Sequence, residues 1–395
     1  MTSSQIVLLL FIGYLVFTLD KKQNYVPVPV VLVVTGIILS FIPYFSSIHV
    51  TSQMIYHIFL PPMLFSSAYR FSSDHFRENA GIITFLATIG IMATVAILGS
   101  VIYAISGPFI SMSFVGALVI ASILTPTDPV SVVSILEQSG NSKKISSVVE
   151  GESLINDGTS IVIFTFIAGM LIENESFTVM SFLQDFLIVS IGGTLIGVAF
   201  GWLMSKAVHI THNREYQVML SIVLAYGVFN FAEQVGVSGV LATVFAGIML
   251  SFEYGRTIKE NDLKDKLDGF WNIAELSVLA LLFLLIGIES SNYLAFNAWG
   301  FAFMIFAASL FIRFIIIAGT TQIFPAWRKK ISWRESTLLS WAGLKGSMSV
   351  FLILQLQSRS SGDNDMIISL SFAAVLISLV VQSLGITPLS KKLTK

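Results

Sequence analysis

The sequence predicts an all-helical protein that crosses a membrane many times. Two observations support this fold class. Hydrophobic residues make up 55% of the chain and charged residues only 11%, whereas a soluble domain usually carries about 25% charged residues. Apolar stretches of about 20 residues, long enough to cross a bilayer as a helix, recur along the whole chain. We therefore expect one transmembrane domain over residues 1–395 and no soluble domain.

Proline, glycine and charged clusters divide this apolar sequence into about thirteen predicted transmembrane helices. The first has no basic residues before it and no small-residue cleavage site after it, so we interpret it as a span and not as a signal peptide. The helices are expected near residues 4–19, 27–43, 53–69, 80–106, 113–138, 145–172, 183–208, 215–233, 237–252, 270–289, 294–324, 332–355 and 365–388.

The distribution of basic residues predicts the orientation of the chain. All but three of the 22 Lys and Arg residues, the exceptions being Arg313, Lys345 and Arg359, fall in alternate loops or in the C-terminal tail. Because basic residues collect on the cytoplasmic side, we expect a cell-membrane protein with its N-terminus outside and its C-terminus inside. The mixed charges of the stretch 253–268 indicate a solvated connector, with a short interfacial helix as the alternative.

Composition also excludes several classes of function. The net charge of −1 and the absence of a concentrated basic face argue against nucleic-acid binding. The chain has no Cys, so it has no disulfide and no Cys-ligated metal. Its His residues show no ligand spacing, although His209 and His212 could sense cytoplasmic pH. No cofactor is expected.

Two prolines interrupt the apolar run Ile123-Leu-Thr-Pro-Thr-Asp-Pro-Val130. Each lacks a backbone N–H and clashes with the preceding turn, so the helix is expected to break around residues 125–128. The freed carbonyls, with the Thr127 hydroxyl and the Asp128 carboxylate, would supply oxygen ligands to a monovalent cation at the middle of the membrane. The alternative is a proline kink in which Asp128 caps a half-helix.

The next predicted helix carries Val149-Glu-Gly-Glu-Ser-Leu-Ile-Asn-Asp-Gly158. Ser153 and Asp157 are four residues apart and share one face, and Glu152 and Asn156 form a second such pair beside it. A carboxylate in this position can hold either a proton or a cation, because burial favours its neutral form and a bound cation favours its charged form. We therefore predict that proton and cation compete for Asp157. The alternative is a buried Asp satisfied by nearby hydroxyls.

Three further charged residues lie inside predicted spans. Arg313 needs an anionic partner, and Glu152 is the expected one; snorkelling to the cytoplasmic surface is the alternative. Lys345 lies between two glycines in Gly343-Leu-Lys-Gly346, which predicts a second broken helix or, alternatively, a lysine near the cytoplasmic surface. Glu275 is left open between a packing hydrogen bond and a place on the ion path.

These motifs resemble the monovalent cation:proton antiporter-1 family, the NhaP-type exchangers and their NHE relatives. The resemblance rests on Thr127-Asp128-Pro129 followed by Gly151-Glu-Ser-Leu-Ile-Asn-Asp-Gly158, and it extends from the sequence at 60–65 to that at 343–346. It implies an NhaA-like antiporter fold with inverted repeats and two broken helices that cross at mid-membrane. It also implies a homodimer in membrane lipid, with an ion-carrying core at 80–172 and 294–388 that moves like an elevator against dimerisation helices at 1–69 and 183–289.

The resemblance also assigns roles to single residues. Asp157 matches the carboxylate that binds proton and cation, and Asn156 matches the Asn that accompanies electroneutral one-for-one exchange. Thr127, Asp128 and Ser153 match positions that help to coordinate the cation, and Glu152 with Arg313 matches a structural ion pair. The chain departs from the family at two supporting positions. Ser66 stands where relatives often carry Glu, and Lys345 stands where they carry Arg, which keeps the charge but loses the bidentate fork.

The sequence therefore predicts a secondary transporter that exchanges Na⁺, or Li⁺ or K⁺, for H⁺. A K⁺/H⁺ antiporter is the nearest alternative. A cation channel is a second, although the chain has no repeated filter motif. An intramembrane enzyme is a third, but one Ser- and Asp-rich helix without spaced His or Cys ligands does not favour it.

Overall fold

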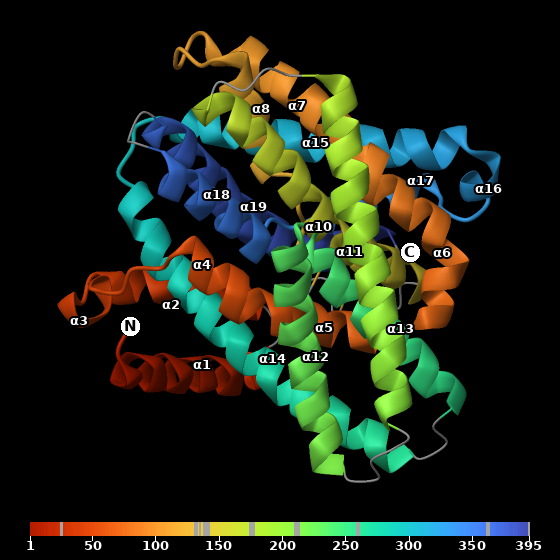
Figure 1. Cartoon of the computed structure of the whole chain (residues 1–395). Coiled ribbons are helices and arrows are strands. Elements are labelled where there is room, and N and C mark those ends of the chain that lie inside the picture. The colour runs from red at the N-terminus through yellow and green to blue at the C-terminus, as the bar shows by residue number, and fades with distance from the viewer. Residues whose placement is uncertain are drawn as a thin grey trace.

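The computed structural model describes residues 1–23, 27–129, 133, 136, 143–173, 178–208, 214–257, 261–360 and 364–393. Those residues form helices joined by short connections and contain no strand (Figure 1). The helices are α1 (Ser3–Gln23), α2 (Val28–Ser40), α3 (Pro43–Ser46), α4 (Ser52–Met54), α5 (Leu60–Arg70), α6 (Ser73–Phe85), α7 (Ile91–Ser106), α8 (Phe114–Ile123), α10 (Lys143–Ile172), α11 (Val179–Val208), α12 (Arg214–Val235), α13 (Gly239–Thr257), α14 (Asn261–Ser290), α15 (Trp299–Ile323), α16 (Pro325–Arg328), α17 (Trp333–Trp341), α18 (Ser347–Arg359) and α19 (Asp365–Leu393).

The all-helical membrane fold is confirmed, and each expected range overlaps at least one described helix. Seven continuous helical stretches of the described residues are long and apolar enough to span a bilayer, one of them formed by α6, the π-helical segment η2 (Leu86–Gly90) and α7 together. Shorter apolar helices include α2 and α8, so the total of about thirteen spans stays a prediction. The stretch 253–268 differs from expectation: α13 continues to Thr257 and α14 already begins at Asn261.

Close helix packing in the bundle depends on glycines, because without a side chain two backbones can approach directly. A β-carbon at Gly36 of α2 would lie 2.2 Å from the Leu284 carbonyl oxygen of α14, and Figure 1 shows these two helices crossing. On α11, β-carbons at glycines 193, 197 and 201 would likewise lie 2.2–2.7 Å from backbone carbonyl oxygens of α13 and of the residue before it. Gly247 of α13 in turn meets the backbone of α5 at Phe65 and Tyr69. Helices α11, α13 and α5 thus form one closely packed wall, which we call the glycine wall.

A π-helical segment, η1 (Ile55–Phe59), leads into α5. Pro61 and Pro62 follow it and have no N–H to offer to the carbonyls one turn earlier. The Ile58 carbonyl instead accepts a hydrogen bond of 2.9 Å from the Tyr226 hydroxyl of α12. The two prolines therefore explain why the helix widens at this point, and single-turn π segments often occur at functional sites.

Candidate functional site

The first helix break occurs at the predicted prolines. Helix α8 ends at Ile123, and residues 124–129 belong to no helix. Thr127 and Asp128 are 4% and 7% exposed, so their backbone groups cannot be satisfied by bulk water. Each of those groups needs a partner inside the protein, because an unpaired buried polar group is costly.

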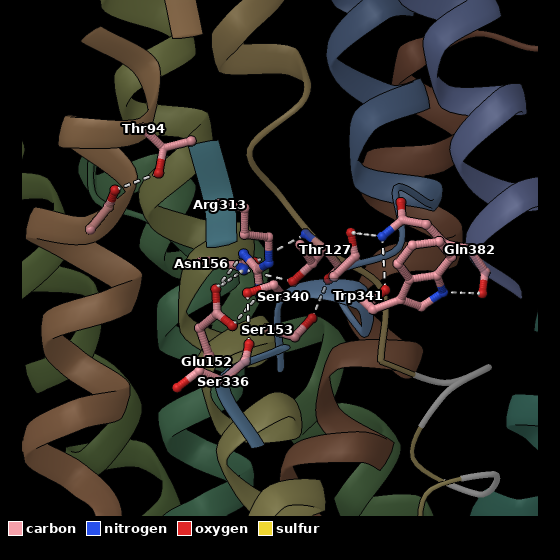
Figure 2. Close-up of polar contacts among 12 residues, drawn as sticks. Thr94, Thr127, Glu152, Ser153, Asn156, Arg313, Ser336, Ser340, Trp341 and Gln382 are labelled. Carbon is pink, nitrogen blue, oxygen red and sulfur yellow. Dashed lines mark hydrogen bonds and ion pairs between the residues drawn. The ribbon is translucent and has the colours of Figure 1, made fainter. Parts of the chain in front are cut away.

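Helix α10 supplies partners for this break. The Asn156 side-chain amide Nδ2 donates to the Thr127 hydroxyl over 2.8 Å, and the Asn156 side-chain oxygen Oδ1 accepts from the Thr127 N–H over 3.4 Å. The Ser153 hydroxyl donates to the Thr127 carbonyl. Figure 2 shows these side chains converging on the broken segment from α10. The spacing of Ser153 and Asn156 on one helix thus positions both against Thr127.

A second break lies between Trp341 at the end of α17 and Ser347 at the start of α18. The two breaks touch: the Asp128 N–H donates to the Leu344 carbonyl over 2.8 Å. Gly346 makes this contact possible, because a β-carbon there would lie 2.4 Å from Asp128 Cβ. The predicted crossing of two broken helices is therefore present in the fold.

Helix α19 supplies hydrogen-bond partners to the backbone groups of the second break, as α10 does for the first. The Ser378 hydroxyl accepts from the Lys345 N–H over 3.1 Å, and the Gln382 amide donates to the Trp341 carbonyl over 2.8 Å. Trp341 returns a bond of 2.9 Å from its indole N–H to the Gln382 carbonyl, drawn in Figure 2. In each half of the chain, a helix later in the sequence, α10 or α19, supplies polar partners to the break, which is the arrangement expected of repeats.

Asp157 lines a small cavity beside the first break, which we call the cation cavity. Its volume is about 30 Å³, measured as the space open to the centre of a water-sized sphere, and about 10–15 Å³ suffices for one water. The sequence-predicted residues in its wall are Thr127, Asp128, Ser153 and Asp157. The Asp157 Oδ1 atom is buried and has no hydrogen-bond partner among the described residues. Glu152 and Asn156 lie behind this wall and do not line the cavity.

Glu152 and Arg313 form a bidentate ion pair beside the site. The two guanidinium nitrogens donate to the two carboxylate oxygens over 2.9 and 2.6 Å, and the side chains are 4% and 11% exposed. Arg313 is therefore held inside the bundle and not at the surface. Gly343 makes room for it, since a β-carbon there would lie 2.2 Å from Arg313 Nε.

Lys345 is also internal, at 4% exposure. It lines a second cavity of about 20 Å³ together with Glu152 and Arg313. Lys345 is therefore enclosed by protein, and its depth in the membrane stays a prediction. Lys345, Arg313 and Glu152 give this region two basic side chains and one acidic one, and none of the three lines the cation cavity.

Ser66 and Glu275 belong to a separate cluster between α5 and α14. The fully buried Ser66 hydroxyl donates to the Glu275 carboxylate over 2.6 Å, and Glu275 also pairs with Arg70. Ser66 points away from the cation cavity, which is lined by its neighbour Ser67. Glu275 thus has the packing hydrogen bond that the sequence left open.

Sequence reasoning missed the wall of the cation cavity that α5 supplies. Leu60, Met63, Leu64 and Ser67 line it, and their spacing places them on one helix face. That spacing was visible in the sequence, but nothing in it marked this face as the one that meets Asp157. The described residues contain no group of three or more His, Asp or Glu side chains arranged to hold a metal. His209 and His212 lie outside the described residues.

Known proteins resemble this chain over most of its length. The family model described as "Sodium/hydrogen exchanger, transmembrane" matches residues 6–392. The chain is 31% identical to the Na(+)/H(+) antiporter NhaH of Halobacillus aidingensis over 402 residues, covering 98% of this chain and 97% of that one. It is 30% identical to the Na(+)/H(+) antiporter NhaP of Pseudomonas aeruginosa, covering 87% and 81%.

Among solved structures, the fold is similar to that of the sodium proton antiporter MjNhaP1 from Methanocaldococcus jannaschii, with a TM-score of 0.79 at 19% identity, covering 99% of this chain and 98% of that one. The crossed breaks and the internal ion pair are features that the family resemblance implies, and the family model matches almost the entire length. The chain belongs to the transmembrane sodium/hydrogen exchanger family.

Proposed function

We propose that this protein exchanges Na⁺ for H⁺ across the cell membrane, one ion for one, and that the two ions compete for the Asp157 carboxylate. The observation that carries the proposal is the buried Asp157 Oδ1, which has no hydrogen-bond partner among the described residues and borders the cation cavity. A carboxylate oxygen without a fixed donor can accept either a proton or a cation.

Oxygen ligands around Asp157 suit a dehydrated monovalent cation. Asp128 and the hydroxyls of Thr127 and Ser153 line the same cavity, and unwound backbone at a helix break is where such transporters bind Na⁺. Asn156 acts one step back, by fixing the Thr127 hydroxyl through its 2.8 Å bond. Only the transported ions are needed, so the mechanism involves no cofactor and no covalent chemistry.

Exchange follows from the burial of the Asp157 carboxylate beside this cavity. A cation entering it favours the charged carboxylate and releases the proton, and a proton arriving favours the neutral form and releases the cation. Because one carboxylate cannot hold both, each crossing of the core carries one or the other. The resulting one-for-one stoichiometry makes transport electroneutral.

The experiment is ion-driven proton movement in proteoliposomes that contain a pH-sensitive dye. A Na⁺ gradient should move protons, and Asp157→Asn should abolish this movement. Asp365→Asn is the matched control, because Asp365 is an exposed carboxylate in the first turn of α19. Normal exchange by Asp157→Asn would contradict the assignment. Repeating the assay with Li⁺ and K⁺ identifies a K⁺/H⁺ antiporter if K⁺ alone drives it.

A membrane potential set by K⁺ and valinomycin separates electroneutral exchange from the other possibilities. The initial rate of Na⁺-driven proton movement should be the same at zero and at −100 mV. A rate that changes with potential would contradict the one-for-one stoichiometry. Flux that rises linearly with Na⁺ concentration without saturating would instead indicate the cation channel.

We further propose that two copies assemble in the lipid membrane, with the N-terminus outside and the C-terminus in the cytoplasm. Support comes from α11, whose apolar side chains, among them Leu187, Ile191, Leu195 and Trp202, are about half exposed. Such a surface must be covered by lipid or by protein. Single-molecule photobleaching in liposomes distinguishes the two, since a dimer bleaches in two steps.

A further inference from the structure

A third and much larger cavity lies on the predicted outer side of the cation cavity. We call it the outer cavity; its volume is about 480 Å³ on the same measure. Its wall includes Tyr56, Ile161, Thr165, Glu233 and Arg359. None of the described residues lines both this cavity and the cation cavity.

The layer between the two cavities is about one helical turn thick. On α10, Asp157 lines the cation cavity and Ile161, four residues later, lines the outer cavity. Along η1 and α5, Leu60 lines the cation cavity and Tyr56, four residues earlier, lines the outer one. Four residues of helix correspond to roughly 6 Å. A displacement of that size at this layer would join the two cavities.

Aromatic rings fill this layer. The Tyr56 ring stacks on Phe351 of α18, with ring centroids 4.6 Å apart and an interplanar angle of 12°. Phe351 is 3% exposed and lies three residues after Met348, which lines the cation cavity. Tyr56 also meets the edge of the buried Phe229 of α12 at 4.9 Å. The stack therefore joins η1 to the second half of the broken helix.

Glu233 at the end of α12 holds the Tyr56 hydroxyl. Its Oε1 accepts from that hydroxyl over 2.8 Å and from the N–H of Gly239, the first residue of α13, over 2.7 Å. The turn between the two helices is fixed by Gly236, whose φ is +84°, and by the Val237 N–H, which donates to the Ala232 carbonyl over 3.0 Å. This is a Schellman cap. The Oε1 atom of Glu233 thus links the Tyr56 hydroxyl to the rigid backbone of this turn.

We propose that Tyr56 is the outer gate of the exchanger, that it closes on Phe351, and that Glu233 is the positioning residue that holds it closed. The inference rests on the proposed exchange function, because a gate on this path has a purpose only if ions pass Asp157. Closing the path with apolar rings excludes water and hydrated ions from the cation cavity. Breaking the stack as α18 moves then opens that cavity to the outer side.

The absence of Cys from the chain allows a direct test by thiol labelling. Met348→Cys places one thiol in the cation cavity, and Val162→Cys places one in the outer cavity. Sealed vesicles are treated on either face with a membrane-impermeant maleimide. Val162→Cys should react from one face only, which defines that face as the outer one. Met348→Cys should react slowly from the same face while the gate is intact.

Removing the Tyr56 ring should expose Met348→Cys to the outer face. In Tyr56→Ala the labelling rate should rise about tenfold, the factor that corresponds to losing one aromatic pair of this kind. Both Tyr56→Phe, which removes the hydrogen bond to Glu233, and Glu233→Gln, which weakens it, keep the ring, so each should raise the rate by about threefold. Phe109→Ala is the matched control: it removes a ring stacked on Phe301 at 5.0 Å and 14°, away from both cavities, and should leave the rate unchanged.

An unchanged rate in Tyr56→Ala, with Val162→Cys still reactive, would overturn the gate. An unchanged rate in Glu233→Gln would overturn the positioning role. If Tyr56→Ala does not fold, Tyr56→Phe still decides whether the hydroxyl contributes. Labelling requires no transport, so repeating it with Asp157→Asn separates the two ideas: exchange would be lost while the effect of Tyr56→Ala remained.

Discussion

Glu152 and Arg313 are two buried charges that satisfy each other, so neither can be removed alone without leaving an uncompensated charge inside the bundle. We expect Arg313→Leu to lower the free energy of unfolding by about 3–5 kcal/mol. The double variant Glu152→Leu/Arg313→Leu should recover part of that loss, because it removes both charges of the pair and leaves Lys345 as the only charge of the three. Unfolding in detergent, followed by loss of helical circular dichroism, measures both.

Arg328→Leu is the control for this pair, since Arg328 is an exposed arginine in α16. Its stability should stay within about 0.5 kcal/mol of the unaltered protein. A double variant no more stable than Arg313→Leu would mean that Arg313 stabilises the fold through packing and not through its charge.

Residue types and spacing predicted much of the site, but not its neighbours in space. The pairs Ser153 with Asp157 and Glu152 with Asn156 follow from helical periodicity. The partnership of Glu152 with Arg313 follows from the cost of a lone buried charge. The roles of Leu344, Ser378 and Gln382 could not be predicted, because which helix packs against a break depends on tertiary structure. The ligand roles of Thr127, Asp128, Ser153 and Asp157 remain predictions.

Among the elements, the contact between the two broken helices depends on Gly346. Gly346→Ala should force the breaks apart, because the added β-carbon would lie 2.4 Å from Asp128 Cβ and 2.5 Å from its Oδ2. We expect Na⁺-driven proton movement to fall by about tenfold or more, since small misplacements of binding groups have large effects on rate.

Gly319→Ala is the matched control, because nothing lies within 4 Å of a β-carbon there. It should keep full exchange and gain slightly in stability, as alanine favours helix more than glycine does. Full exchange by Gly346→Ala would show that the two breaks can separate without harm to the cation site.

Breaks were easier to predict than helix lengths and pitch. Pro126 and Pro129, and the glycines around Lys345, identified both interruptions because the backbone chemistry of these residues is local. The π-helical segment η1 was not expected, since the tyrosine that satisfies its Ile58 carbonyl comes from α12. The extension of α13 and α14 into the charged stretch was also missed, because charged residues are compatible with helix outside the membrane.

For the whole molecule, the proposed exchange by alternating access would require the layer between the cation cavity and the outer cavity to open and close. Joining Tyr56→Cys to Phe351→Cys with a short bifunctional thiol reagent should therefore stop exchange by holding η1 against α18. Reduction of a cleavable reagent should restore it. Sodium-driven proton movement before and after cleavage is the measurement.

Phe200→Cys with Phe231→Cys is the control for cross-linking, because these rings pack α11 against α12 with centroids 5.1 Å apart and neither lines the cation cavity or the outer cavity. Its cross-linked form should transport normally. Continued exchange by the Tyr56–Phe351 cross-link would mean that η1 and α18 move together throughout the cycle.

The glycine wall has a consequence for local stability. Where α11 and α13 meet, carbonyls of one helix lie against the α-carbons of the other, so water can reach the amide groups between them only if the two helices separate completely. In heavy water, backbone protons of α11 near Gly197 should exchange for deuterium far more slowly than those at the exposed N-terminal end of the same helix. Gly197→Leu should remove that protection, and mass spectrometry of the resulting peptides would show it.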